Sequence, residues 1–187
     1  MSFDFVITEK IIENKMKSLR SDYTICLNGN EKEKAMYPII LYCFSIIDIL
    51  GTYYTGNACR EANTENLEKF LEKYLKYKPH EIKIITELFR HKIVHLSSAK
   101  PRYRRDNGKY ITWKITWNGC CNRKIVNKSG NITDDFGKIY KIDQIFTFSI
   151  QSLIKEIEEA SHRYLSDLKK DPQLQAQFYQ AHQKIWE

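Results

Sequence analysis

The sequence has little glycine and little proline. Only 7 of its 187 residues are glycine and 4 are proline, which excludes collagen-like and glycine- or proline-rich disordered chains. Hydrophobic residues make up 42% of the chain and charged residues 28%, both close to the averages of globular proteins. The length is that of one domain, so we expect a single folded domain over residues 1–187.

The sequence also lacks a hydrophobic run long enough to span a membrane. The longest apolar stretch, Ile39–Leu50, is interrupted by Ser45 and Asp48, whereas a spanning helix needs about 20 apolar residues. The N-terminal residues do not combine a basic segment with an apolar one, which is the pattern of secretory signals. We therefore expect a cytoplasmic protein that does not associate with membranes.

The cysteines are too scattered to predict a metal site. None of the five forms a CxxC pair, the spacing typical of structural zinc sites. His91 and His95 stand four residues apart, a spacing that can bind a metal from one helix face. Lys92, however, occupies the position that glutamate has in an HExxH site. We expect no metal and no cofactor.

Acidic residues are scarce in one segment, and this makes the basic charge local. The whole chain has a net charge of +7, yet residues 100–128 alone contain nine basic residues and a single acid, Asp106. Four aromatic residues interleave with these charges: Tyr103, Tyr110, Trp113 and Trp117. Lysine and arginine neutralise phosphates, and aromatic rings stack on exposed bases. The segment is consistent with a nucleic-acid contact or with a solvated hairpin whose aromatic side chains pack inward.

Apolar residues at helical spacing predict helices over most of the chain. The expected helices cover about residues 4–22, 31–54, 64–76, 79–100, 143–169 and 172–185. Thr64, Asp143 and Asp171 are the expected N-caps of three of them. Pro38 should start or kink the second helix.

Between Pro101 and Asp143 the apolar residues alternate instead. Ile111 and Ile115 belong to a half-buried strand, and Asn118-Gly119 predicts a hairpin turn after it. Further strands are expected at about 122–126 and 138–142. The expected fold is mainly α, an up-and-down helical bundle with a small antiparallel β-hairpin insertion at about residues 102–142.

The segment Glu87–His95 carries the most informative residues. Arg90 is followed by the polar residue His91, by three further residues and then by His95. This pattern resembles the motif of the HEPN superfamily, whose members are mostly four- or five-helix bundles and many of which are metal-independent endoribonucleases. The run from Ile47 to Gly51 also looks like HEPN-type sequences, and the resemblance covers about residues 31–100.

The resemblance implies roles for the motif residues. His95 would be the general acid or base, a task that suits a group titrating near neutral pH. Arg90 would stabilise the charge on the phosphate, and His91 would orient a phosphate or the other side chains. Residues that follow the motif would hold RNA near it: Lys100, Arg102, Tyr103, Arg104 and Arg105, with Tyr103 stacking a base.

The spacing of Arg90 and His95 poses a geometric problem. Residues five apart on an ideal α-helix lie about 140° apart around its axis. Either the helix is distorted near His95 or the motifs of two copies combine. HEPN ribonucleases commonly dimerise with their motifs facing each other, so we expect a homodimer.

Asp48 is the second conspicuous residue. An ionised carboxylate within an apolar run is costly unless it is paired, so we expect Asp48 to pair with Arg90 or a motif histidine and to orient that group. The alternative is that Asp48 lies on the solvent edge of its helix beside Ser45 and Thr52.

Three functions are consistent with the sequence. The first is a HEPN-like, metal-independent endoribonuclease that cleaves RNA by 2′-hydroxyl transesterification, related to a toxin or to defence and open to an unidentified regulator or antitoxin. The second is a non-catalytic HEPN-like module that binds RNA or nucleotides. The third is a protein-interaction module that docks through an apolar patch around Trp113 and Trp117.

Overall fold

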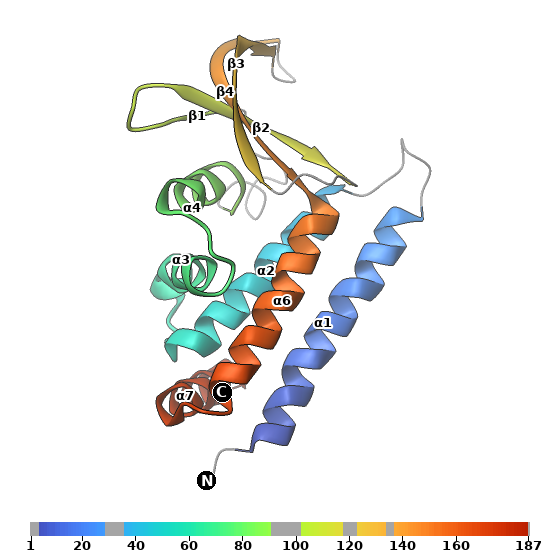
Figure 1. The fold of residues 1–187 in the computed structure, drawn as a ribbon, viewed down its shortest axis with the longest axis vertical. Coiled ribbons are helices and arrows are strands. Elements are labelled where there is room, and N and C mark those ends of the chain that lie inside the picture. Colours follow the sequence, from blue (N-terminus) through green and yellow to red (C-terminus); the bar gives the residue numbers. More distant parts are fainter. Residues whose placement is uncertain (1–3, 29–35, 91–101, 118–122, 134–136, 187) are drawn as a thin grey trace. The chain divides into compact units, whose positions relative to one another are not determined.

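The computed structural model describes residues 4–28, 36–90, 102–117, 123–133 and 137–186 (Figure 1). Over these residues the chain is mixed α/β, with six α-helices and a four-stranded mixed sheet. The expected predominance of helix is correct, but the β region is larger than a small hairpin. The chain divides into two compact units: a helical unit of Met1–Ile82 and Ile154–Glu187, and a sheet unit of Lys83–Leu153.

The helical unit is built mainly from five helices. They are α1 (Phe5–Leu27), α2 (Met36–Thr55), α3 (Asn63–Lys73), α6 (Ile150–Leu168), most of which lies in this unit, and α7 (Pro172–Trp186). Asp171 caps α7, because its Oδ1 accepts hydrogen bonds from the backbone N–H groups of Gln173 and Leu174 at 2.8 and 3.3 Å, as the sequence predicts. The expected cap at Thr64 is wrong: α3 begins at Asn63 after Ala62, which provides no side-chain cap.

Helix α2 is the core helix of the helical unit. Ile40, Cys43, Ile47 and Leu50 are fully buried along it. With 20 residues it is also long and apolar enough to cross a membrane, by length and composition alone, although 56% of its 18-residue apolar window is buried within the fold. The helix is therefore longer than the apolar run Ile39–Leu50 that the sequence shows. Since more than half of its apolar window is buried, α2 is consistent with a core helix.

Helices α2 and α3 approach each other closely at Gly51. A Cβ atom on Gly51 would lie 2.4 Å from the carbonyl oxygen of Asn66. The Asn66 side chain joins the two helices, since its Oδ1 accepts from Thr55 Oγ1 and its Nδ2 donates to the carbonyl of Asn57, both at 2.7 Å. A glycine at this position is what allows the contact.

The sheet unit contains four strands in the order β1-β2-β4-β3. The strands are β1 (Tyr103–Arg104), β2 (Tyr110–Thr116), β3 (Lys124–Thr133) and β4 (Ile139–Ser149). The pairs β1·β2 and β3·β4 are antiparallel, whereas β2 and β4 are parallel. The half-buried strand expected around Ile111 and Ile115 is confirmed as β2.

The hairpin predicted at Asn118-Gly119 is wrong, because β2 and β3 are not neighbours. Strand β4 lies between them and pairs with both. A tight turn between β1 and β2 lies at Arg105–Lys109, where the Arg105 amide donates to the Lys109 carbonyl at 2.9 Å. Gly108 has a φ of 79° there, a conformation that glycine adopts without strain.

The start of the helix predicted at Asp143 is also wrong. Strand β4 continues to Ser149 and α6 begins at Ile150, where Ser149 Oγ accepts from the Ser152 amide at 3.0 Å. Asp143 instead accepts a hydrogen bond from the backbone of Tyr110 at 2.9 Å. Burial on every second residue from Ile142 to Phe148 explains the strand.

The segment that leads into the motif changes its helical geometry. Helix α4 (Pro79–Ile85) starts at the predicted proline and is followed by a π-helical turn, η2 (Thr86–Arg90). Short π-helical turns inside helices are rare and occur frequently at functional sites.

Candidate nucleic-acid interface

The two faces of the sheet differ in chemistry, because successive side chains of a strand point to opposite sides. One face carries the apolar side chains that are buried: Ile111, Ile115, Ile142, Phe146 and Phe148. The other face carries exposed basic side chains, Arg104, Lys114, Lys124 and Lys141, and we call it the basic face.

The strand register orders the basic face into rows. Thr147 of β4 pairs with Lys114 of β2 on one side and with Lys124 of β3 on the other. The next row along the strands consists of Thr112, Ile145 and Val126, and Val126 is 39% exposed. Lys114 and Lys124 therefore lie on either side of Thr147, and the exposed side chain of Val126 lies in the neighbouring row.

Cations and aromatic rings alternate across the sheet from β1 to β4, near the first residues of β2 and β4. The Arg102 guanidinium lies 4.0 Å from the centre of the Tyr110 ring and 5.0 Å from that of Tyr140. Arg104 continues the series at 6.0 Å from Tyr110, and Lys138 at 5.4 Å from Tyr140. We call this set of five residues the cation–aromatic ladder. Arg102 is also fixed by a hydrogen bond from its Nη1 to the Lys141 carbonyl at 2.9 Å, so its charge is held in place.

On the opposite, buried face, Arg105 takes part in a network of side-chain hydrogen bonds with Gln144 and Asn127. Arg105 Nη1 donates to Gln144 Oε1 at 2.7 Å, and Gln144 Nε2 donates to Asn127 Oδ1 at 2.8 Å. Because Gln144 is buried, both halves of its amide need partners, and the two neighbours supply them. Arg105 therefore joins the first strands of the sheet to β4 and β3.

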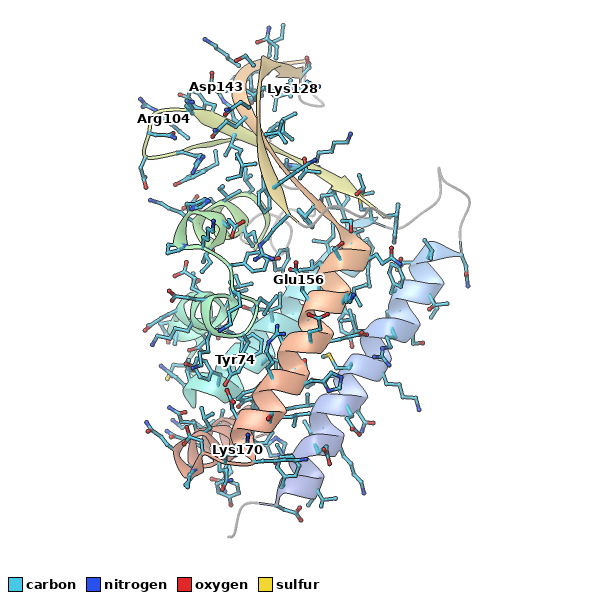
Figure 2. The ribbon with its side chains drawn as sticks, in the orientation of Figure 1. Tyr74, Arg104, Lys128, Asp143, Glu156 and Lys170 are labelled. Carbon is cyan, nitrogen blue, oxygen red and sulfur yellow. The ribbon has the colours of Figure 1, made fainter. Side chains whose placement is uncertain are left out.

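The two acids described between residues 102 and 149 are both engaged. Asp143 accepts from the Tyr110 backbone, as above. Asp106 accepts from Lys83 Nζ at 2.9 and 3.2 Å, and this hydrogen bond raises the pKa of the Lys83 ammonium. Figure 2 labels Arg104 on β1, Lys128 on β3 and Asp143 on β4, around a sheet on which cations predominate.

Four of the five predicted RNA-binding residues are described, and they divide between the two faces of the sheet. Arg102 and Arg104 belong to the ladder. Tyr103 pairs with Ile111 and so points to the buried face, where it interacts with Lys83. Arg105 points the same way as Tyr103, and Lys100 lies outside the described residues.

The predicted catalytic residues are described only in part. Arg90 is the last residue of the π-helical turn, and its side chain, like all of His91 and His95, lies outside the described set. The turn ends at Arg90, so its geometry lies before the interval between Arg90 and His95.

Asp48 lies in α2 of the helical unit. Its side chain is half-buried, and its backbone carbonyl accepts from Thr52 Oγ1 at 2.9 Å. Ser45 on the same helix is exposed and Thr52 is buried. The pairing predicted with Arg90 or a motif histidine involves side chains outside the described residues.

Sequence reasoning missed several residues of the interface. Tyr110, Lys114 and Lys124 were expected only as members of the basic segment, and Tyr140, Lys138 and Lys141 were not expected at all. The sequence feature that could have identified them is the alternation of polar and apolar residues within each strand. It places Lys114 and Ile115 on opposite faces of the sheet, and likewise Lys141 and Ile142. It becomes useful only when the strand order is known.

Within the described residues, no group of three or more histidine, cysteine, aspartate or glutamate side chains could hold a metal ion. Comparison of the chain with protein family models, with curated proteins and with solved structures found no match.

Proposed function

We propose that the protein is a HEPN-like, metal-independent endoribonuclease that binds RNA on its sheet unit. The observation that carries the binding part is the cation–aromatic ladder beside the basic face. Arg102, which its hydrogen bond to the Lys141 carbonyl holds in place, and the exposed Arg104 offer cations for phosphates, while exposed apolar surface around Val126 offers contacts for bases. Nucleic-acid binding proteins that do not read sequence combine the same elements: a positively charged groove and aromatic side chains.

The cleavage part rests on the resemblance of the motif. A 2′-hydroxyl attacks the adjacent phosphorus, the bond to the 5′-oxygen breaks, and a 2′,3′-cyclic phosphate remains on one product. His95 transfers a proton in this step, and Arg90 stabilises the charge that develops on the phosphate oxygens. The π-helical turn that ends at Arg90 supports this assignment, because such turns are frequent at functional sites. The protein acts as a homodimer that brings two motifs together.

The test is a cleavage assay on mixed RNAs in EDTA. It compares the wild type with Arg90→Ala, His95→Ala and the double variant Lys114→Gln/Lys124→Gln. Lys10→Gln, an exposed lysine of α1 in the helical unit, is the matched control. We expect cyclic phosphate ends from the wild type and from Lys10→Gln and no cleavage by the two motif variants. The double variant should cleave with a raised KM, because it loses phosphate contacts but keeps the motif.

Equal cleavage by the wild type and both motif variants would remove the catalytic assignment. Unchanged KM in the double variant would remove the basic face from the interface. Size-exclusion chromatography with light scattering on the same samples measures the mass, and a monomer that cleaves would contradict the dimer.

A non-catalytic RNA-binding module is the second candidate. It is favoured by the fact that the ladder and the basic face use none of the motif residues. In this case the wild type would bind RNA in a salt-sensitive manner, would leave it intact, and would bind as tightly as His95→Ala.

A further inference from the structure

An acid stands on the otherwise basic face of the sheet (Figure 2). Asp143 of β4 shares this face with Tyr110 of β2, because their buried neighbours Gln144 and Ile111 point to the other side. Asp143 Oδ2 accepts from the Tyr110 amide at 2.9 Å, and within the described residues the carboxylate makes no other hydrogen bond and no ion pair. A carboxylate repels phosphate, so a different part of an RNA ligand has to face Asp143.

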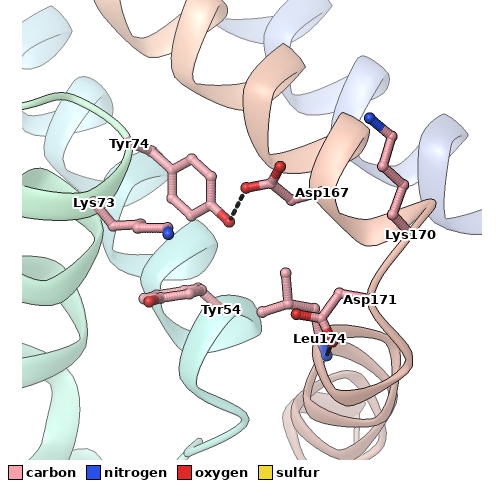
Figure 3. Close-up of a pocket in the computed structure, with 7 residues that line it drawn as sticks. All are labelled: Tyr54, Lys73, Tyr74, Asp167, Lys170, Asp171 and Leu174. Atoms are coloured by element: carbon pink, nitrogen blue, oxygen red, sulfur yellow. Dashed lines mark hydrogen bonds between the residues drawn. The ribbon is translucent and has the colours of Figure 1, made fainter.

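The acids that line a pocket of the helical unit stand in a different environment. In the pocket drawn in Figure 3, Asp167 and Asp171 share the lining with Lys73 and Lys170, so opposite charges balance there. Asp167 also accepts from a tyrosine hydroxyl at 3.1 Å, and Asp171 caps α7. The carboxylate of Asp143 has no such balance and keeps the capacity to bind a ligand.

Arg102 places a cation next to the same tyrosine. Its guanidinium lies 4.0 Å from the centre of the Tyr110 ring and 5.0 Å from that of Tyr140, and its Nη1 donates to the Lys141 carbonyl at 2.9 Å. Lys141 stands two residues before Asp143, about 7 Å along the strand. Arg102 and Asp143 are therefore neighbours, yet within the described part of the chain they form no ion pair with each other.

Both side chains keep hydrogen-bonding groups free. A guanidinium carries several N–H donors in a fixed fork, and a carboxylate has two acceptor oxygens. In the described structure Arg102 uses one of its nitrogens as a donor and Asp143 one of its oxygens as an acceptor. Neither residue contributes a buried nitrogen or oxygen without a partner, so the remaining groups face solvent. The surface thus presents a fork of donors close to an acceptor.

Guanine is the base that matches donors beside an acceptor. Its O6 and N7 are two acceptors on one edge, and the bidentate contact of arginine to this pair is the commonest specific contact to a base. Its N1–H and N2 amino groups are donors on the neighbouring edge, where a carboxylate can accept. Adenine has a donor in place of O6, and uracil has no second acceptor equivalent to N7. In single-stranded RNA both edges of the base are open.

The fixed position of Arg102 suits base recognition better than phosphate binding. Sequence is read by hydrogen bonds to base edges, and recognition requires side chains that packing and hydrogen bonds hold in place. Two rings and a backbone carbonyl hold Arg102, and the Tyr110 ring beside it can stack on a base. The phosphates on either side of that base can be bound by the exposed Arg104, Lys114 and Lys124.

We propose that Arg102 and Asp143 bind one guanine of a single-stranded RNA, Arg102 through O6 and N7 and Asp143 through the N1–H and N2 groups. The inference rests on the proposed function, since it names the base that the RNA-binding sheet selects. Arg102 and Asp143 then determine which nucleotide is bound, while the exposed cations contribute affinity for any RNA.

Fluorescence anisotropy of the full chain in EDTA tests the proposal, on a His95→Ala background that keeps the RNA intact. The probes are labelled oligouridines that differ in one central nucleotide. This nucleotide is guanosine, adenosine, 7-deazaguanosine, which lacks the N7 acceptor, or inosine, which lacks the N2 amino group. Guanosine monophosphate is titrated separately, because a free nucleotide offers the same base without the flanking phosphates of RNA.

The variants remove hydrogen-bonding groups and preserve the fold. Arg102→Lys keeps the charge but loses the fork of donors. Asp143→Asn keeps an oxygen for the Tyr110 amide and replaces the free acceptor by a donor. Arg104→Lys, in the same ladder, is the control for the first change. Asp4→Asn is the control for the second, because Asp4 Oδ1 also accepts from a backbone amide, at 3.1 Å.

We expect the guanosine probe to bind about tenfold more tightly than the adenosine probe, since a bidentate contact to the correct base discriminates by a factor of that order. 7-Deazaguanosine and inosine should each lose most of this preference. The preference should persist in Arg104→Lys and Asp4→Asn and disappear in Arg102→Lys and Asp143→Asn. Guanosine monophosphate should bind more weakly than the guanosine probe, because it lacks the neighbouring phosphates.

Equal, salt-sensitive binding of the guanosine and adenosine probes would overturn the guanine site and leave RNA binding by the sheet unit intact. No binding of any probe would overturn both. The comparison of guanosine with 7-deazaguanosine needs no pocket variant, so equal binding of these two probes overturns the contact to N7 even if Arg102→Lys does not fold. A guanine preference that survives in Arg102→Lys and Asp143→Asn would overturn the assignment to these residues. Guanosine monophosphate that binds as tightly as the probe would overturn RNA as the source of the base.

Discussion

At the scale of single residues, the helical unit buries tyrosines whose hydroxyl groups are unequally satisfied. The rings of Tyr54, Phe70, Tyr74 and Tyr164 contact one another at centroid distances of 5.0 to 6.4 Å. Tyr74 donates its hydroxyl hydrogen to Asp167. Tyr164 is fully buried, and within the described residues its hydroxyl has no hydrogen-bond partner. Burial raises the pKa of Tyr164 well above its ordinary value.

The first prediction concerns Tyr164→Phe and alkaline pH. The folded state holds the Tyr164 proton more tightly than the unfolded state, so this group stabilises the fold below the unfolded pKa of about 10 and progressively loses that effect above it. The free energy of unfolding should therefore fall above about pH 10 in the wild type and fall less steeply in the variant. At pH 8 the variant should be at least as stable, because an unpartnered buried hydroxyl costs roughly 1–3 kcal/mol.

Urea unfolding followed by circular dichroism between pH 8 and pH 11 measures both effects. Tyr42→Phe removes a hydroxyl from a half-exposed ring of α2 and is the comparison variant. If Tyr164→Phe loses stability at pH 8 and keeps the wild-type slope, the hydroxyl has a partner in solution and the prediction is wrong.

At the scale of elements, local signals located the helices, whereas they did not give the sheet order. The cap at Asp171 and the start at Pro79 depend on neighbouring residues, and both are visible in the sequence. The parallel pairing of β2 with β4 joins residues more than thirty positions apart, such as Ile111 and Gln144. No local pattern indicates such a pairing, and the Asn118-Gly119 signal on its own therefore predicts a hairpin between β2 and β3, which are not neighbours. The alternation through Phe146 and Phe148 could have extended β4 beyond Asp143.

The second prediction belongs to the contact of α2 with α3. Gly51→Ala places a Cβ 2.4 Å from the Asn66 carbonyl oxygen, and the other nearest atoms belong to the backbone of Asn66 and Leu67, which cannot move aside as a flexible side chain could. We expect the overpacking to cost about 1–3 kcal/mol and to exceed the gain of roughly 1 kcal/mol in helix propensity. Gly130→Ala in β3, where a Cβ would meet no atom within 4 Å, should change stability by much less. Equal midpoints of thermal unfolding for the two variants would contradict this account of the packing.

At the scale of the whole molecule, the charge is concentrated in one unit. Residues 102–149 contain ten basic and four acidic residues, a net charge of +6 out of +7 for the chain. The sequence alone is enough to locate this concentration of positive charge, because counting charged residues along the chain requires no knowledge of the fold. It could not separate Arg104 from Arg105, adjacent residues that the strand directs to opposite faces. It also could not group Lys114 with Lys124, which become neighbours only through Thr147 of β4.

The third prediction uses that grouping to measure how many charges contact RNA. A protein that binds a single strand releases counterions, and the logarithm of its association constant falls with the logarithm of salt concentration at a slope of about −0.7 per phosphate contact. On a His95→Ala background, which keeps the RNA intact, Lys114→Gln/Lys124→Gln should reduce the magnitude of this slope by about 1.4 for two lost contacts. Lys10→Gln should leave it unchanged. Fluorescence anisotropy with a single-stranded oligonucleotide over a series of salt concentrations gives the slopes. If Lys10→Gln reduced the magnitude of the slope as much as Lys114→Gln/Lys124→Gln does, RNA binding would depend on the overall charge of the chain. The basic face would then have no special part in binding.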